Sequence, residues 1–250
     1  MKVQLLRHAT LLVTINGKKI LVDPMLGKAR CMPPITNSPN SQRNPLVELS
    51  TSLNLEQDMD GVLLTHTHQD HFDGAAAEKL PRNKPMFCQP EDEEKLKTLG
   101  FSEVYPISDR FSWEGIIMER TGGQHGTGEI GMKMAPVSGY ILEGKGEPSL
   151  YIAGDTIYCA EVADTISMYQ PSIVIVNAGG ARFNVGDPIT MTAEDVTKVC
   201  QAVPKSKIIA VHMEAINHCM ESRDSLHTYL KQVGFQNQVL IPVDGEIMHL

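Results

Sequence analysis

The segment Thr65-His66-Thr67-His68-Gln69-Asp70-His71 places three histidines and one aspartate within six residues. It follows directly on the apolar run Gly61–Thr65, which is typical of a short buried strand. A His-x-His-x-Asp-His pattern arises by chance in roughly one chain in a thousand of this length and composition. Neutral imidazoles and carboxylates are ligands that zinc, manganese and iron accept. The segment therefore predicts a metal-binding loop at the end of a strand.

The spacing within this loop indicates room for two cations. His66 and His68 lie two residues apart at a strand end, so their rings project to the same side and can share one ion. Asp70 and His71 lie where the chain turns towards a helix expected at Asp73–Leu80, and they can serve a second ion beside the first.

Three further candidate ligands share one kind of position, just past an apolar strand. They are His125, Asp155 and His212, which follow predicted strands at residues 116–120, 150–153 and 208–211. Taken singly, each would more often be structural. Their common placement groups them with the histidine loop as the ligand set that two metals would need.

The rest of the chain reads as strands followed or separated by helices. Strands are expected at Val3–Arg7, Leu11–Ile15, Ile20–Val22, Gly61–Thr65, Ile116–Arg120, Gly139–Leu142, Leu150–Ala153, Ile173–Asn177 and Ile208–Val211. Helices are expected at Asp73–Leu80, Pro90–Leu99, Tyr158–Tyr169, Thr192–Val203 and Asp224–Val233. Asn16-Gly17 predicts a hairpin turn. This order favours an α/β domain over residues 1–250, with sheets covered by helices.

One long segment fits neither pattern. Residues 25–55 are rich in Pro, Asn and Ser and are too long for a passive connection, so they are either a flexible segment or a lid over a binding site.

Composition excludes several classes of protein. The 250 residues are 42% hydrophobic and carry a formal charge of −8 without a basic stripe, so nucleic acid and an anionic membrane surface are not expected partners. No apolar run approaches the roughly 20 residues of a spanning helix, and no signal peptide is recognised. The five cysteines form no CxxC pair and are interpreted as buried small side chains in a reducing, cytoplasmic protein.

The histidine loop and the three later ligands together resemble the metallo-β-lactamase superfamily, from the Val22-Asp23-Pro24 stretch to His212. The resemblance implies an αββα sandwich, with two mixed sheets flanked by helices. It implies that one metal is held by His66, His68 and His125, and the other by Asp70, His71 and His212. Asp155 would bridge the two ions, and Asp23 would orient a histidine ligand. Zinc is the first expectation for both ions, with manganese or iron as alternatives.

Two smaller motifs, Arg7-His8-Ala9-Thr10 and Leu21-Val22-Asp23-Pro24, resemble the branch that contains the ascorbate-6-phosphate lactonase and N-acyl-phosphatidylethanolamine phospholipase D. Antibiotic hydrolysis is disfavoured, because the bridging position is Asp155 and not a cysteine.

The reaction implied is hydrolysis by a water that two metals activate, with Asp70 and Asp155 as the catalytic carboxylates. A small lactone, ester or amide is the expected substrate. A small phosphodiester is the alternative, and a non-enzymatic metal-binding or sensing module is a third reading. A diiron–flavin enzyme would need a further module for which no chain length remains. Candidate substrate contacts are His8, Arg182, His218 and Arg223, whereas His227 and His249 are interpreted as structural. Homo-oligomerisation stays open.

Overall fold

The computed structural model describes residues 1–250 as two seven-stranded sheets with six α-helices. The first sheet has the order β14-β1-β2-β3-β4-β5-β6 and the second β13-β12-β11-β10-β9-β8-β7. The first comprises β1 (Lys2–Arg7), β2 (Thr10–Ile15), β3 (Lys18–Val22), β4 (Gly61–Leu63), β5 (Met86–Cys88), β6 (Val104–Pro106) and β14 (Ile247–His249). The second comprises β7 (Arg110–Trp113), β8 (Ile116–Thr121), β9 (Gly139–Gly144), β10 (Leu150–Ile152), β11 (Ile173–Asn177), β12 (Lys207–Val211) and β13 (Val239–Leu240).

Both sheets are mixed in strand direction. β1, β2 and β3 pair antiparallel, whereas β3 to β6 run parallel. In the second sheet β7 to β10 pair antiparallel and β10 to β13 run parallel. The predicted turn between β2 and β3 is confirmed, because Asn16 and Gly17 both have the positive φ that the tightest hairpin turns require. The parallel strands place their carboxyl ends at one edge of each sheet.

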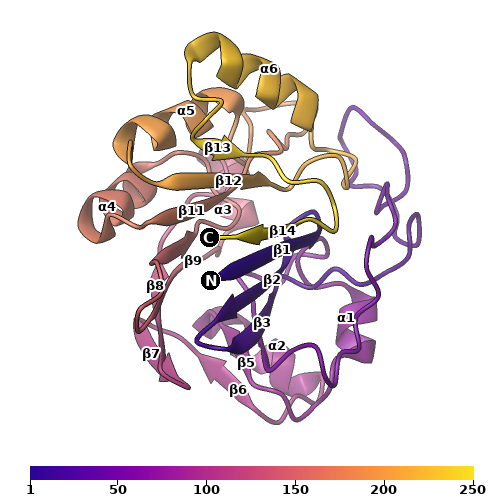
Figure 1. Cartoon of the computed structure of the whole chain (residues 1–250). Coiled ribbons are helices and arrows are strands. Elements are labelled where there is room, and N and C mark those ends of the chain that lie inside the picture. Colours follow the sequence, from indigo (N-terminus) through magenta and orange to yellow (C-terminus); the bar gives the residue numbers. More distant parts are fainter.

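Helices cover the outer faces of the sheets (Figure 1), and an apolar core lies between the two sheets. The helices are α1 (Gly74–Lys79), α2 (Glu93–Thr98), α3 (Gly128–Met134), α4 (Ala160–Tyr169), α5 (Ala193–Ala202) and α6 (Arg223–Val233). The inner core joins both sheets, as in the cluster that contains Val13, Leu63, Leu142 and Ile209. α4, α5 and α6 pack on the second sheet, and α1 and α2 on the first. The αββα sandwich is therefore confirmed.

Local capping signals place two of these helices. The Asp73 side chain accepts a hydrogen bond from the Ala76 amide and caps α1, and Thr192 with Asp195 forms the capping box that starts α5.

Several elements differ from the expectation. The helix predicted at Pro90–Leu99 divides into a 3₁₀ turn at Pro90–Asp92 and the shorter α2. β5, β6, β7, β13, β14 and α3 were not predicted. The strands among them have two to four residues, too few to show a period, and β14 pairs with β1 from the opposite end of the chain.

The irregular segment 25–55 contains neither helix nor strand, apart from one bridge between Met32 and Asn44. Its beginning is nevertheless held firmly. The guanidinium of Arg7, which is fully buried, donates to the carbonyls of Met25, Gly27 and Val47. Asp73 accepts from the amides of Leu26 and Gly27 as well as capping α1. The segment is therefore tied to the first sheet beside the histidine loop.

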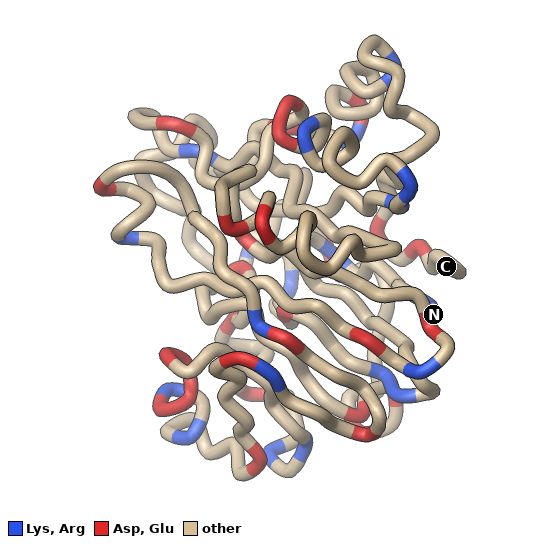
Figure 2. Tube along the Cα trace, turned by 90° about the vertical axis from the view of Figure 1, so that its left-hand side faces the viewer, with Lys and Arg blue, Asp and Glu red and all other residues tan.

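The structure contains no helix of the length and apolarity needed to span a membrane. Lys/Arg and Asp/Glu positions are interspersed along the side of the molecule that Figure 2 shows.

Candidate metal centre

The predicted ligands converge where the two sheets present their strand ends to one another. His66, His68, Asp70 and His71 follow β4 of the first sheet. The other three follow strands of the second sheet: His125 comes after β8, Asp155 after β10 and His212 after β12. Residues distant in sequence thus meet because parallel strands share an edge.

The side chains form connected donor groups whose ligand atoms lie within 4.8 Å of one another. One group consists of His66, His68 and His125. A second consists of His8, Asp70, His71 and His212, and a third joins His66 and His71 to Asp155. The structure therefore brings together all seven predicted ligands and adds His8.

Asp155 lies between the first two groups. Its Oδ2 is 3.4 Å from Nε2 of His125, and its Oδ1 is 3.2 Å from Nε2 of His212. The Asn177 side chain, at the end of β11, donates to Oδ1 at 2.6 Å and fixes the carboxylate from behind.

Four of the imidazoles are held from outside through Nδ1, which leaves Nε2 for the centre of the cluster. Nδ1 of His71 contacts Asp23 Oδ2 at 2.8 Å, and Nδ1 of His125 contacts the Ile189 carbonyl at 2.8 Å. Nδ1 of His66 lies 3.0 Å from the Thr65 hydroxyl, and Nδ1 of His212 lies 3.6 Å from the Cys219 sulfur. Such outer contacts set the tautomer and orientation of a metal-ligating histidine.

Burial and charge are balanced within the cluster. Burial lowers the pKa of His8 to about 3 and that of His125 to about 4, so both are neutral imidazoles. Burial acts in the same direction on His71, but Asp155, Asp23 and Asp70 outweigh it and raise the pKa of His71 to about 10. Burial raises the pKa values of Asp70 and Asp155, yet nearby histidines hold both well below the usual range.

The donor set fits divalent metal ions. Nε2 of His66 is buried and has no hydrogen-bond partner, although His66 belongs to two of the donor groups. A buried imidazole nitrogen without a partner is costly unless a cation satisfies it. Imidazole and carboxylate donors together suit zinc, manganese and iron.

A cavity of about 300 Å³ opens beside this cluster. Five polar residues line it. Three are predicted ligands, His68, Asp70 and His125, and the other two are Gln69 of the histidine loop and His218. Its apolar wall consists of Ile35, Met134 and Phe183. No lysine or arginine lines it.

The candidate substrate contacts fall in different places. His218 lines the cavity, is buried, and has an Nδ1 without a partner. His8 does not line it: its ring is fully buried and packs on His212, with ring centres 3.6 Å apart. Arg182 is exposed, next to the cavity residue Phe183. The structure does not bring Arg223 to the cavity, because its guanidinium is held by Glu214, Asp244 and the Pro242 carbonyl.

Two residues that contact the ligand His212, Cys219 and Gly179, are not predicted from the sequence. The interpretation of all five cysteines as buried small side chains is wrong for Cys31, which is exposed. Gly179 lies so close to His212 that a Cβ there would clash with the His212 carbonyl oxygen. Neither role has a local sequence signal. His227 and His249 are exposed, away from the cluster.

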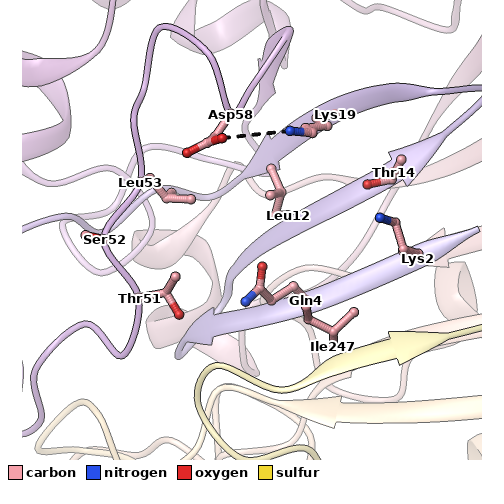
Figure 3. Close-up of a pocket in the computed structure, with 10 residues that line it drawn as sticks. All are labelled: Lys2, Gln4, Leu12, Thr14, Lys19, Thr51, Ser52, Leu53, Asp58 and Ile247. Carbon is pink, nitrogen blue, oxygen red and sulfur yellow. Dashed lines mark ion pairs between the residues drawn. The ribbon is translucent and has the colours of Figure 1, made fainter.

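A separate hollow of about 260 Å³ lies on the outer face of β1, β2 and β3 (Figure 3). Lys2, Gln4 and Thr14 line it, and they alternate with core residues such as Val3 and Val13, so it faces away from the space between the sheets. It contains no member of the donor groups and is crossed by a Lys19–Asp58 ion pair of 3.8 Å.

Asp23 is the most informative outer residue to change. Its carboxylate accepts from the Thr65 amide and hydroxyl and contacts Nδ1 of His71. We expect Asp23→Asn to weaken metal binding by about 10- to 100-fold, because His71 loses its orienting carboxylate. Competition with a chromogenic chelator measures this. Asp60→Asn, which removes a carboxylate that accepts from the Lys19 amide of β3, is the matched control. Equal affinities of Asp23→Asn and wild type would contradict the orienting role.

Histidine and aspartate donor groups at the strand ends of an αββα sandwich place the chain in the class of metal-binding proteins with the metallo-β-lactamase fold. A family model described as the Beta-lactamase superfamily domain matches residues 18–213, so the chain belongs to that superfamily and is a metal-dependent hydrolase. Within it, the chain is 39% identical over 251 residues to the UPF0173 protein YddR of Bacillus subtilis, covering 98% of both chains, and so falls in the UPF0173 family.

Other relatives agree. A UPF0173 metal-dependent hydrolase of Methanopyrus kandleri is 24% identical, with 98% of each chain covered. Among solved structures, an isothiocyanate hydrolase from Delia radicum gut bacteria matches with a TM-score of 0.94 and 33% identity, covering 100% of this chain and 99% of that one. A possible metal-dependent hydrolase from Veillonella parvula matches with a TM-score of 0.96 and 31% identity over 100% and 99% of the chains.

Proposed function

We propose that the chain hydrolyses a small, uncharged substrate at an electron-poor carbon, using two divalent metal ions. The carbon is the carbonyl carbon of a lactone, ester or amide, or the central carbon of an isothiocyanate. The observation that carries the proposal is the pair of donor groups linked by Asp155 next to a cavity without lysine or arginine. His66, His68 and His125 would hold one ion, and Asp70, His71 and His212 the other, with Asp155 between them.

When bound, the metal pair supplies Lewis-acid polarisation and lowers the pKa of a water. The protein supplies the proton acceptor and the positioning. Asp70 is the only carboxylate that lines the cavity, so it takes the proton of the attacking water. It passes this proton to the leaving oxygen or nitrogen of an ester, lactone or amide, or to the nitrogen of an isothiocyanate. Asp155, which accepts a hydrogen bond from Asn177, keeps the two donor groups at a fixed position relative to each other. His218 donates to the oxygen or sulfur on which negative charge develops.

Two observations support an uncharged substrate over the phosphodiester alternative. Three apolar residues of the cavity match an apolar substituent, and neither a lysine nor an arginine lines the cavity to bind a second phosphate oxygen. The neighbour named as an isothiocyanate hydrolase supports including isothiocyanates. The resemblance to the branch with the ascorbate-6-phosphate lactonase is our reason for including lactones among the proposed substrates. We also place the enzyme in the cytoplasm, acting without nucleic acid or membrane partners, as a monomer or homo-oligomer.

The test is a panel of substrates with zinc- and manganese-loaded protein. It contains γ- and δ-lactones, p-nitrophenyl esters, an anilide, phenethyl isothiocyanate and bis-p-nitrophenyl phosphate. We expect turnover of at least one uncharged substrate at a kcat/KM well above that of the phosphate. Preference for the phosphodiester would overturn the substrate class, and full metal occupancy without any hydrolysis would favour the binding or sensing module.

A further inference from the structure

The apolar wall of the cavity depends on a part of the chain that has no regular structure. Ile35 belongs to the irregular segment 25–55, yet it lines the cavity beside the donor groups. A loop residue can select substrates only if its backbone is fixed. The backbone of Ile35 meets this condition through two buried asparagines.

Asn217 holds Ile35 as a neighbouring strand would. The Ile35 amide donates to Oδ1 of Asn217 at 2.9 Å, and Nδ2 of Asn217 donates to the Ile35 carbonyl at 3.0 Å. Nδ2 also lies 2.7 Å from the Ser38 hydroxyl and donates to the Asn40 carbonyl. Asn217 is 1% exposed, so its amide group is costly to leave without hydrogen-bond partners.

Asn44 completes the arrangement from the other end of the same loop. Its Nδ2 donates to Oδ1 of Asn217 at 2.7 Å, and its own Oδ1 accepts from the Asn217 backbone amide at 2.9 Å. Asn44 is also 1% exposed and forms the bridge with Met32. The side chains of Asn44 and Asn217 close residues 32–44 into a turn. We call this pair of asparagines the amide clamp.

The amide clamp is joined to the reacting centre by a short, buried stretch. Asn217 lies five residues after the ligand His212, and the residue after it is the cavity histidine His218. The backbone of this stretch is paired on both sides: the Leu46 amide donates to the Ala215 carbonyl, and the Arg182 amide donates to the His218 carbonyl. The same stretch therefore positions His218 and, through Asn217, Ile35.

Resting on the proposed function, we infer that the amide clamp makes Ile35 a specificity-determining wall: residues 32–44 hold Ile35 at one side of the substrate cavity, where it selects the length of an apolar substituent. Asn217 and Asn44 are positioning residues, because they act through Ile35 and touch no reacting atom. On this inference, residues 32–44 keep their place during turnover and do not act as a lid.

Two sets of variants test the wall and the clamp separately. Ile35→Ala and Ile35→Trp change the wall and leave the clamp intact, since Asn217 bonds to the Ile35 backbone. Asn217→Asp keeps the shape of the side chain but replaces its two N–H donors by an acceptor that faces the carbonyls of Ile35 and Asn40. Asn237→Asp, at an exposed position, is the matched control.

Binding is measured with alkyl hydroxamates from acetohydroxamate to octanohydroxamate, by calorimetry on zinc-loaded protein. We expect Ile35→Trp to weaken the binding of octanohydroxamate by at least about tenfold, because methylene-sized changes in an apolar pocket have effects of this order. The affinity for acetohydroxamate should stay unchanged. Ile35→Ala should shift the optimum to longer chains. Identical chain-length profiles for wild type, Ile35→Ala and Ile35→Trp would overturn the wall.

Hydrogen exchange tests the clamp without any ligand. In Asn217→Asp, amides of residues 32–44 should exchange at least about tenfold faster than in wild type, while the β4 amides stay unchanged. Unchanged exchange in that segment would overturn the clamp, and should Asn217→Asp not fold, Asn44→Asp provides the same measurement. If the panel of esters, lactones and isothiocyanates is not hydrolysed but the hydroxamate profile follows Ile35, the proposed reaction fails and the specificity wall stands.

Discussion

Asp155→Ala is expected to lower kcat/KM by about a thousandfold or more, since a metal pair contributes several kcal/mol of transition-state stabilisation and each 1.4 kcal/mol is a factor of about ten. Asp155 is the one carboxylate within 3.4 Å of histidines from both main donor groups. Its loss would remove the carboxylate 3.2 Å from Nε2 of both His71 and His212 and would reduce the metal content of the protein. His66→Ala should have the same two effects.

Steady-state kinetics and elemental analysis of the same samples measure this prediction. Asp164→Ala, which removes an exposed carboxylate from α4, is the matched control and should behave as wild type. Full turnover by Asp155→Ala at reduced metal content would show that the cluster is not the reacting centre.

Arg7→Met is expected to give the largest loss of stability, about 3 to 5 kcal/mol, because hydrogen bonds from a charged donor are worth roughly 1.5 to 3 kcal/mol each when a buried partner is left unsatisfied. Arg7 is fully buried and donates to the carbonyls of Met25, Gly27 and Val47. Methionine fills the volume but leaves these three carbonyls without their donor. The start of segment 25–55 should therefore loosen together with the histidine loop that Asp73 ties to it.

Urea unfolding measures the change as a lower midpoint at an unchanged m-value. Arg110→Met on β7 removes an exposed arginine whose ion pair with Glu119 contributes little, and is expected to change stability by less than about 1 kcal/mol. A midpoint for Arg7→Met equal to that of Arg110→Met would contradict the stabilising role of the buried guanidinium.

The layers and the donor positions could be predicted from local pattern. β4 leading into the histidine loop, the Asn16-Gly17 hairpin and the Thr192 capping box each have a signal contained within a few residues. The later donors were recognisable because each follows an apolar strand. These features follow from the spacing of apolar residues, from turn-forming residues and from helix caps, all of which can be recognised in a single sequence.

The features that could not be predicted depend on partners far apart in the chain. His8 joins the second donor group because the chain reverses at His8 itself, with φ of 60°, at the end of β1 where the pairing with β2 shifts register. Asn44 and Asn217 pair across 173 residues, and each alone reads as an ordinary loop asparagine. Arg223 lies near His212 in sequence, but Glu214 and Asp244 hold its guanidinium. Side-chain direction at strand ends is set by tertiary contacts.

The most direct test of the dinuclear hydrolase is a titration of metal-free protein with zinc, in which bound metal and hydrolysis of the best panel substrate are followed in the same samples. Two ions bound to one chain, with activity absent before addition and restored as the ions bind, is the predicted result. Undiminished hydrolysis by the metal-free protein would contradict a metal-dependent reaction at this cluster.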